Sequence, residues 1–135
     1  MILSKDLARI HSWLIICGSN DFHRPGTKHE LPEVVRLFYD WSKQRSEKQL
    51  PVFLVTSLTC SSGNVTFVRE NSGAVGVFAG FLIQGVTLYP SDTTRNLLRE
   101  FGSILLRAVG QDALEFQHHG TIWCLRRTDL DKPNQ

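Results

Sequence analysis

The chain has few of the residues and segments that mark specialised classes of protein. Only three of its 135 residues are cysteines, Cys17, Cys60 and Cys124, and no CxxC or CxH spacing occurs. A disulfide framework and a zinc site therefore lack support. No apolar run reaches the roughly 18 to 20 residues that span a bilayer, and no signal-like apolar stretch opens the chain. We expect a protein of the reducing cytoplasm with no membrane partner.

A large excess of one charge is also missing. The 15 basic and 13 acidic residues leave a formal net charge of +2, which is too small to indicate nucleic-acid binding. The densest basic cluster, Lys43, Arg45 and Lys48, lies at the end of a predicted helix. Cations there complement the helix dipole, so a structural role explains them and no nucleic-acid partner is expected.

The common catalytic motifs are absent as well. The sequence contains no GxGxxG, GxxxxGK[ST], HExxH or GxSxG pattern, so nucleotide-triphosphate and zinc-hydrolase functions lose their usual support. His23 and His29 fall in one polar loop, and His118 and His119 are adjacent in a predicted turn. Adjacent turn residues point to opposite sides, which favours a solvated turn over a metal site. No metal and no cofactor are expected.

What remains is the composition of an ordinary globular protein, with 41% apolar and 21% charged residues. The length fits one domain over residues 1–135, with a polar tail from about Asp129. Ser12–Cys17 is a continuous apolar run closed by Gly18, which is typical of a central strand buried on both faces. Gly18–Lys28 is a polar loop of the kind that often holds functional groups.

Two segments have helical periodicity. Leu31–Ser46 carries one apolar face, with Pro32 in its first turn. Thr93–Ala108 carries another, with Ser91 or Asp92 as its cap and Gly110 at its end. The strand patterns are Val52–Leu58, Val65–Glu70 after a turn at Thr59–Asn64, Ala74–Leu88 as one strand or a hairpin, and a last hairpin of Leu114–Gln117 with Thr121–Leu125.

The resulting order is strand, helix, two or three strands, helix and two strands. Hairpins outnumber strand–helix–strand crossovers, so a doubly wound parallel sheet is disfavoured. The order predicts an α+β, ferredoxin-like sandwich: a mainly antiparallel sheet with two helices on one face.

Glu70 is the most conspicuous acid, because it ends a predicted strand beside the aromatic residues Phe67 and Phe78. A carboxylate and aromatic ring faces both attract a positive centre, which suits a cationic ligand. The competing interpretation is a strand-end carboxylate paired with Arg69 or water. Gln111 and Asp112, after the second helix, form the other candidate, unless they only terminate that helix.

The chain resembles the small phage enzymes that degrade S-adenosylmethionine, the S-adenosylmethionine lyases. The resemblance rests on Arg69-Glu70 at a strand end, on the strand and helix that follow, and on Gln111-Asp112 leading into the last hairpin. It also includes a first strand, Trp13–Gly18, followed by a polar loop and a helix. It covers most of the chain in order, with a handful of identities.

The resemblance implies a phage-encoded, metal-independent enzyme that cleaves S-adenosylmethionine into 5′-methylthioadenosine and L-homoserine lactone. It implies a homotrimer with active sites between subunits. Glu70 becomes the catalytic candidate, and Gln111, Phe67, Arg69 and Phe78 become substrate-binding candidates.

Two other functions fit the same architecture. One is a non-catalytic binding protein, for instance an inhibitor of a host enzyme, and the other is a ligand sensor or regulatory domain. An enzyme should keep a concave pocket around Glu70, whereas an interaction module should present a flat apolar patch. The apolar run Ala74–Ile83 is long for this size of domain, so we expect another subunit to cover part of it.

Overall fold

The computed structural model describes residues 11–53, 58–68 and 75–130. Its elements follow the predicted alternation of strands and helices. In chain order they are β1 (His11–Gly18), α2 (Leu31–Glu47), β2 (Leu58–Val68), β3 (Val75–Thr87), α3 (Ser91–Val109), β4 (Ala113–His118), β5 (Thr121–Arg126) and α4 (Arg127–Leu130).

The strands form one sheet in the order β2-β3-β1-β4-β5, with every neighbouring pair antiparallel. The predicted central strand is confirmed, because β1 pairs with β3 on one side and with β4 on the other. The first four strands and the two long helices have the βαββαβ order of a ferredoxin-like sandwich. β5 extends the edge through the predicted hairpin, which turns at His119 and Gly120.

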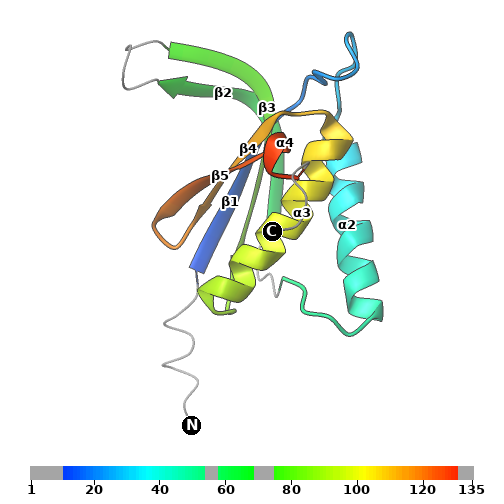
Figure 1. Ribbon diagram of the computed structural model, residues 1–135, viewed down its shortest axis with the longest axis vertical. Helices are drawn as coiled ribbons and strands as arrows, with labels where there is room; N and C mark the ends of the chain where they lie inside the picture. Colours follow the sequence, from blue (N-terminus) through cyan, green and yellow to red (C-terminus); the bar gives the residue numbers. More distant parts are fainter. Residues whose placement is uncertain (1–10, 54–57, 69–74, 131–135) are drawn as a thin grey trace.

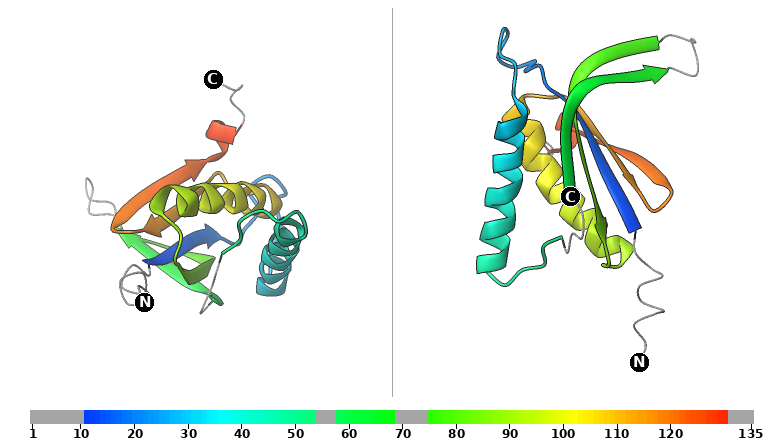
Figure 2. Two further views of the ribbon diagram at one scale, coloured as in Figure 1. Left: turned by 90° about the horizontal axis from the view of Figure 1, so that it is seen from below. Right: turned by 180° about the vertical axis from the view of Figure 1, so that it is seen from behind.

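The two long helices lie on the same face of this sheet, as Figure 1 and the two further views in Figure 2 show. The predicted fold class, an α+β sandwich with a mainly antiparallel sheet, is confirmed. No helix in the described part of the chain is long and apolar enough to cross a membrane.

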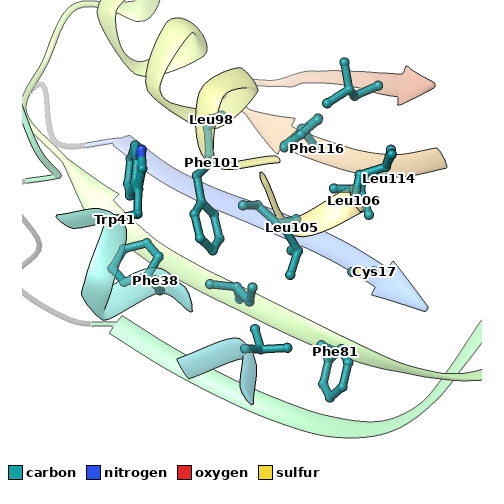
Figure 3. Packing of buried hydrophobic residues seen from close by; sticks show 14 of the residues in the cluster. Cys17, Phe38, Trp41, Phe81, Leu98, Phe101, Leu105, Leu106, Leu114 and Phe116 are labelled. Atoms are coloured by element: carbon teal, nitrogen blue, oxygen red, sulfur yellow. The ribbon is translucent and has the colours of Figure 1, made fainter. Parts of the chain in front are cut away.

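The core lies between the helices and the covered face of the sheet (Figure 3). Phe101 of α3 is fully buried, with its ring centroid 5.0 Å from that of Phe38 and 5.2 Å from that of Trp41. Gly102 lets α3 approach β4 closely, because a Cβ there would overlap the ring of Phe116. Burial of these large aromatic groups, together with that of the aliphatic residues around them, stabilises the sandwich.

The sequence misplaced the strand that follows α2. Val52 and Phe53 lie outside any strand, and residues 54–57 of the predicted strand lie outside the described residues. Thr59–Asn64, predicted as a turn, belongs instead to the continuous strand β2. Its small polar residues mimic a turn in composition, but their backbone pairs with β3 along its length. Within the predicted segment Ala74–Leu88, Val75–Thr87 form a single strand, β3, and not a hairpin, and Ala74 lies outside the described residues.

Two smaller boundaries also differ from prediction. Pro90 occupies the N-cap position of α3 without a side-chain hydrogen bond, so Ser91 and Asp92 belong to its first turn. The C-cap was predicted correctly, since Gly110 ends the helix in the left-handed conformation with a φ of 69°. The expected polar tail begins with the short helix α4, and residues 131–135 lie outside the described residues.

Candidate functional site

The carboxyl end of β1 is where polar side chains gather. The loop of residues 19–30, the end of α3, and the ribbon formed by β2 and β3 meet there, at the upper end of the sheet in Figure 1. The sequence singled out this loop as a candidate for functional groups. Several of its polar side chains are buried, which is uncommon for a surface loop.

A row of glycines crosses three strands at this point. Gly18 of β1 pairs with Gly80 of β3, and Gly80 pairs in turn with Gly63 of β2. The missing side chain at Gly18 has a packing role, since a Cβ there would lie 2.5 Å from Oε1 of Gln111. At Gly63 a Cβ would meet nothing within 4 Å, so the surface there is open.

Gln111 is buried at the junction of α3 and the loop. Its side-chain amide nitrogen donates to the carbonyl oxygen of Asn20, and its backbone N–H donates to the carbonyl of Leu106 at 3.0 Å. Next to it, the N–H of Phe22 donates to the carbonyl of Gly110 at 3.0 Å. These contacts fix the loop against the end of α3. A ligand role for Gln111 remains a prediction.

A histidine between two carboxylates anchors the other side of the loop. Nε2 of His29 lies 2.9 Å from Oδ2 of Asp21, and Nδ1 lies 2.5 Å from Oε2 of Glu33 in the first turn of α2. The second oxygen of Asp21, Oδ1, accepts hydrogen bonds from the backbone N–H groups of His23 and Arg24, each at 2.9 Å. Because both ring nitrogens face carboxylates, the protonated imidazole satisfies both contacts.

The pKa values at this anchor reflect those contacts. The hydrogen bond from His29 lowers the pKa of Asp21, opposed by burial and reinforced by the two backbone N–H groups. Burial by itself disfavours the protonated form of His29, but the hydrogen bonds and charges of Asp21 and Glu33 outweigh it and raise its pKa. We call Asp21, His29 and Glu33 the loop anchor.

A small cavity of about 190 Å³ opens beside the loop anchor, between the loop and the base of the β2/β3 ribbon. Its walls come from the loop and from the paired strands at the glycine row. Six of its lining residues are Ser19, Lys28, Glu30, Ser62, Gly63 and Gly80.

The predicted aromatic candidates are on the ribbon beyond the glycine row. Phe67 pairs with Gly76, and Phe78 pairs with Val65, so a single rung of the β2/β3 ladder, Thr66 opposite Val77, separates the rungs of the two phenylalanines. Arg69 and Glu70 lie outside the described residues, which resume at Val75. Their roles remain predictions.

The ribbon carries these candidates away from the body of the molecule. The pairing of β1 with β3 stops at Gly80, whereas β2 and β3 pair with each other for five more rungs, to Val68 opposite Val75. At about 3.3 Å per residue the last pair lies roughly 16 Å from the glycine row. Gln111 touches that row, so the ribbon end and Gln111 are separated within one chain.

The histidine turn differs from its prediction. His118 is buried, and burial, together with the charges of His11 and His119, lowers its pKa. Nδ1 of His119 lies 3.0 Å from Nδ1 of His11. His118 is therefore not a solvated turn residue, because it faces the covered side of the sheet beside β1. Among the described residues no group of three His, Cys, Asp or Glu side chains is arranged to hold a metal ion.

Comparison with known proteins gives a match in fold. A phage SAM lyase in complex with S-methyl-5′-thioadenosine superimposes with a TM-score of 0.58 and 14% sequence identity, over 87% of this chain and 90% of that chain. A phage SAM lyase in the apo state gives a TM-score of 0.56 and 14% identity, over 86% and 88%. No protein-family model and no curated protein sequence matches.

Sequence reasoning missed the loop anchor and the cavity. Asp21 and Ser19 carry no motif. The side-chain partners of Asp21 are spread along the irregular loop, and the backbone N–H of Ser19 donates to Ala79 of the distant strand β3. One local signal was present, because His29 and Glu33 are four residues apart at a helix start, a spacing that brings side chains together. The buried positions of Ser19 and Asp21 follow from how the loop folds over the strand end.

The chain shares the fold of the phage SAM lyases.

Proposed function

We propose that the protein is an S-adenosylmethionine lyase, which cleaves its substrate into 5′-methylthioadenosine and L-homoserine lactone. The observation that carries the proposal is the agreement between a resemblance in sequence and a resemblance in fold. The sequence resembles the phage lyases at Arg69-Glu70 and Gln111-Asp112, and the fold resembles them over 87% of this chain. Fold alone does not define a function, so the residues give the proposal its chemical content.

The reaction needs no metal and no second substrate. An oxygen of the substrate's own carboxylate forms a bond to the γ-carbon of the methionine moiety, and the bond from that carbon to sulfur breaks. The bonding electrons pass to the sulfonium, which leaves as the neutral thioether of methylthioadenosine. The protein's task is to fold the methionine chain into a near-attack conformation and to exclude water.

Glu70 is the proposed catalytic residue, with its carboxylate close to the positive charge of the sulfonium or the ammonium group. Phe67 and Phe78 would add ring faces that favour a cation. Arg69 and Gln111 would bind polar parts of the substrate. Because the ribbon end lies roughly 16 Å from the glycine row that Gln111 touches, a site that uses both regions draws them from different subunits.

An oligomer is supported by two features of the sheet. The outer part of the β2/β3 ribbon pairs with no other strand in the described chain, and a two-stranded ribbon alone is marginally stable in water. The face of the sheet away from the helices carries the half-buried Leu14 and Val86 and the 65% exposed Ile122 around a hollow of about 540 Å³. We propose a homotrimer that covers this face, with active sites between subunits.

A binding protein without catalysis is the alternative. The observation that favours it is an apolar strip on α2, where Val35 is 46% exposed and Tyr39 62% exposed beside Leu31 and Pro32. Such a strip suits a protein partner more than a small molecule. It predicts no turnover and a 1:1 complex with a host protein.

The deciding experiment is incubation of the purified protein with S-adenosylmethionine in EDTA, followed by chromatography of the products. Methylthioadenosine and homoserine lactone should appear at equal rates. Intact substrate at high protein concentration, together with no heat of binding in calorimetry, would reject the lyase. Sedimentation tests the oligomer, since a strictly monomeric protein contradicts both the trimer and the shared site.

Glu70→Gln should remove most of the activity while leaving the fold intact, because the change keeps the shape and deletes the charge. Loss of a charged contact in the transition state predicts a fall in kcat/KM of roughly 100-fold. Glu47→Gln, at the end of α2, is the matched control and should keep full activity. Circular dichroism and product formation are measured on both variants; normal turnover by Glu70→Gln removes Glu70 from the mechanism.

A further inference from the structure

Ser19 has a buried hydroxyl group that makes no hydrogen bond to the rest of the described chain. Its side-chain oxygen is inaccessible and has no hydrogen-bond partner within the described part of the chain, and the residue is 3% exposed. Its backbone is fully engaged: the N–H donates to the carbonyl of Ala79 at 3.1 Å, and the carbonyl accepts the N–H of His29 at 2.8 Å. A buried hydroxyl without a partner is costly, so its presence points to a ligand.

Ser19 lines the cavity of about 190 Å³ beside the loop anchor. Ser62 lies across from it on β2, next to the open surface at Gly63. Pockets for whole drug-sized ligands occupy roughly 300 to 1,000 Å³. This cavity is smaller, so it fits one end of such a ligand and not a whole nucleoside.

The rim of the cavity carries one charge of each sign. Lys28 and Glu30 are exposed and line it, and they alternate with the buried His29 along the loop. Neither Lys28 nor Glu30 forms an ion pair with another described residue. The charges of Asp21 and Glu33 are directed at His29, which leaves Lys28 and Glu30 as the charges available to a ligand.

The geometry points to a subsite for a zwitterionic α-amino-acid group, with the carboxylate against Ser19 and Lys28 and the ammonium towards Glu30. A buried hydroxyl and one charge of each sign match the two ends of that group. They do not match a ligand group that is purely anionic or purely cationic. As far as it concerns the substrate's methionine end, this inference rests on the proposed lyase function.

Such a subsite would also orient the reacting group. A hydroxyl that donates to one carboxylate oxygen leaves the other oxygen free for attack on the γ-carbon. The glycine row beside the cavity allows the remainder of a substrate to approach the backbone closely at Gly63. Ser19 and Lys28 are then positioning and binding residues, and they take no part in proton transfer.

The test compares two unreactive ligands by calorimetry on the full-length protein. S-adenosylhomocysteine keeps the amino-acid end and methylthioadenosine lacks it. The Kd for methylthioadenosine divided by the Kd for S-adenosylhomocysteine therefore measures the contribution of the subsite to binding. We expect S-adenosylhomocysteine to bind the wild type more tightly. Ser19→Ala and Lys28→Met should each reduce that ratio by roughly tenfold, with the Kd for methylthioadenosine unchanged.

Lys43→Met, an exposed lysine on α2 far from the cavity, is the matched control and should leave the ratio unchanged. Ser19→Ala should fold, since the hydroxyl has no described partner to lose. A wild type that cleaves S-adenosylmethionine but binds both ligands equally, or variants that keep the wild-type ratio, would overturn the subsite and leave the lyase standing. A wild type that neither cleaves the substrate nor binds either ligand rejects the lyase, and the inference fails with it.

Discussion

The hydrophobic core and the loop anchor are both buried, yet they stabilise the molecule in different ways. Phe101 is in contact with Phe38 and Trp41 through many weak contacts that have little directional preference. Asp21 and His29 are held by a few directional contacts, including those to Glu33 and to backbone N–H groups. The core therefore determines that the sandwich forms, whereas the anchor determines where the loop of residues 19–30 lies.

The largest expected effect is on the core. Phe101→Ala should lower the free energy of unfolding by about 3–5 kcal/mol, because it removes a fully buried ring and leaves a cavity. Tyr39→Ala, at a 62% exposed position on α2, is the control and should change stability by less than about 1 kcal/mol. Urea unfolding measures both; equal losses would show that Phe101 does not lie in the core.

A smaller effect is expected where α3 meets the loop anchor. Gly110→Ala should cost about 2 to 4 kcal/mol, since it strains a left-handed residue and places a Cβ against the Asp21 carboxylate. Gly26→Ala has the same backbone constraint, with a φ of 85°, but a Cβ there meets nothing within 4 Å. It should cost about 1–2 kcal/mol. If the two variants unfold at the same urea concentration, the contact with Asp21 carries no stability.

The smallest effect should be the only one of the three that depends on pH. His29→Gln should lower stability by about 1.5 kcal/mol in mildly acidic solution, by loss of hydrogen bonds to charged partners. Burial opposes protonation of His29, but Asp21 and Glu33 raise its pKa above the ordinary value. Its contribution is therefore complete below about pH 6.5 and is lost as the pH rises through the raised pKa of the folded state.

Urea unfolding of the wild type and His29→Gln between pH 5.5 and 9 checks this dependence. The difference between them should shrink as the pH rises. His23→Gln removes a largely exposed pair with Asp112 and should change stability by less than about 1 kcal/mol. A wild-type advantage over His29→Gln that grows with pH would mean that His29 is held in its neutral form.

The sequence was sufficient for the sandwich because its elements have strong periodic patterns. The apolar run of β1 and the apolar faces of α2 and α3 are read directly from residue spacing, and the structure has them in the predicted order. The predicted turn at Thr59–Asn64 was wrong because pairing with the distant strand β3 overrode the local preference of Ser, Gly and Asn for turns.

The site was less accessible to sequence reasoning. Gln111 and the polar loop were recognised as candidates, but the contact between Gln111 and Asn20 joins residues 91 positions apart. The burial of Ser19 and Asp21 depends on how the loop folds over the end of β1, which no local pattern encodes. Phe67 and Phe78 were placed on strands correctly, and whether they bind a substrate stays a prediction.

The most direct test of the proposed lyase is to follow the reaction with S-adenosylmethionine in water enriched in oxygen-18 and to measure the masses of the products at early times by mass spectrometry. Intramolecular attack predicts methylthioadenosine together with homoserine lactone that carries no label. Any label that enters later, through opening of the lactone, should be in the carboxyl group. Homoserine labelled at its hydroxyl oxygen from the first time point, or substrate that stays intact, would contradict the account.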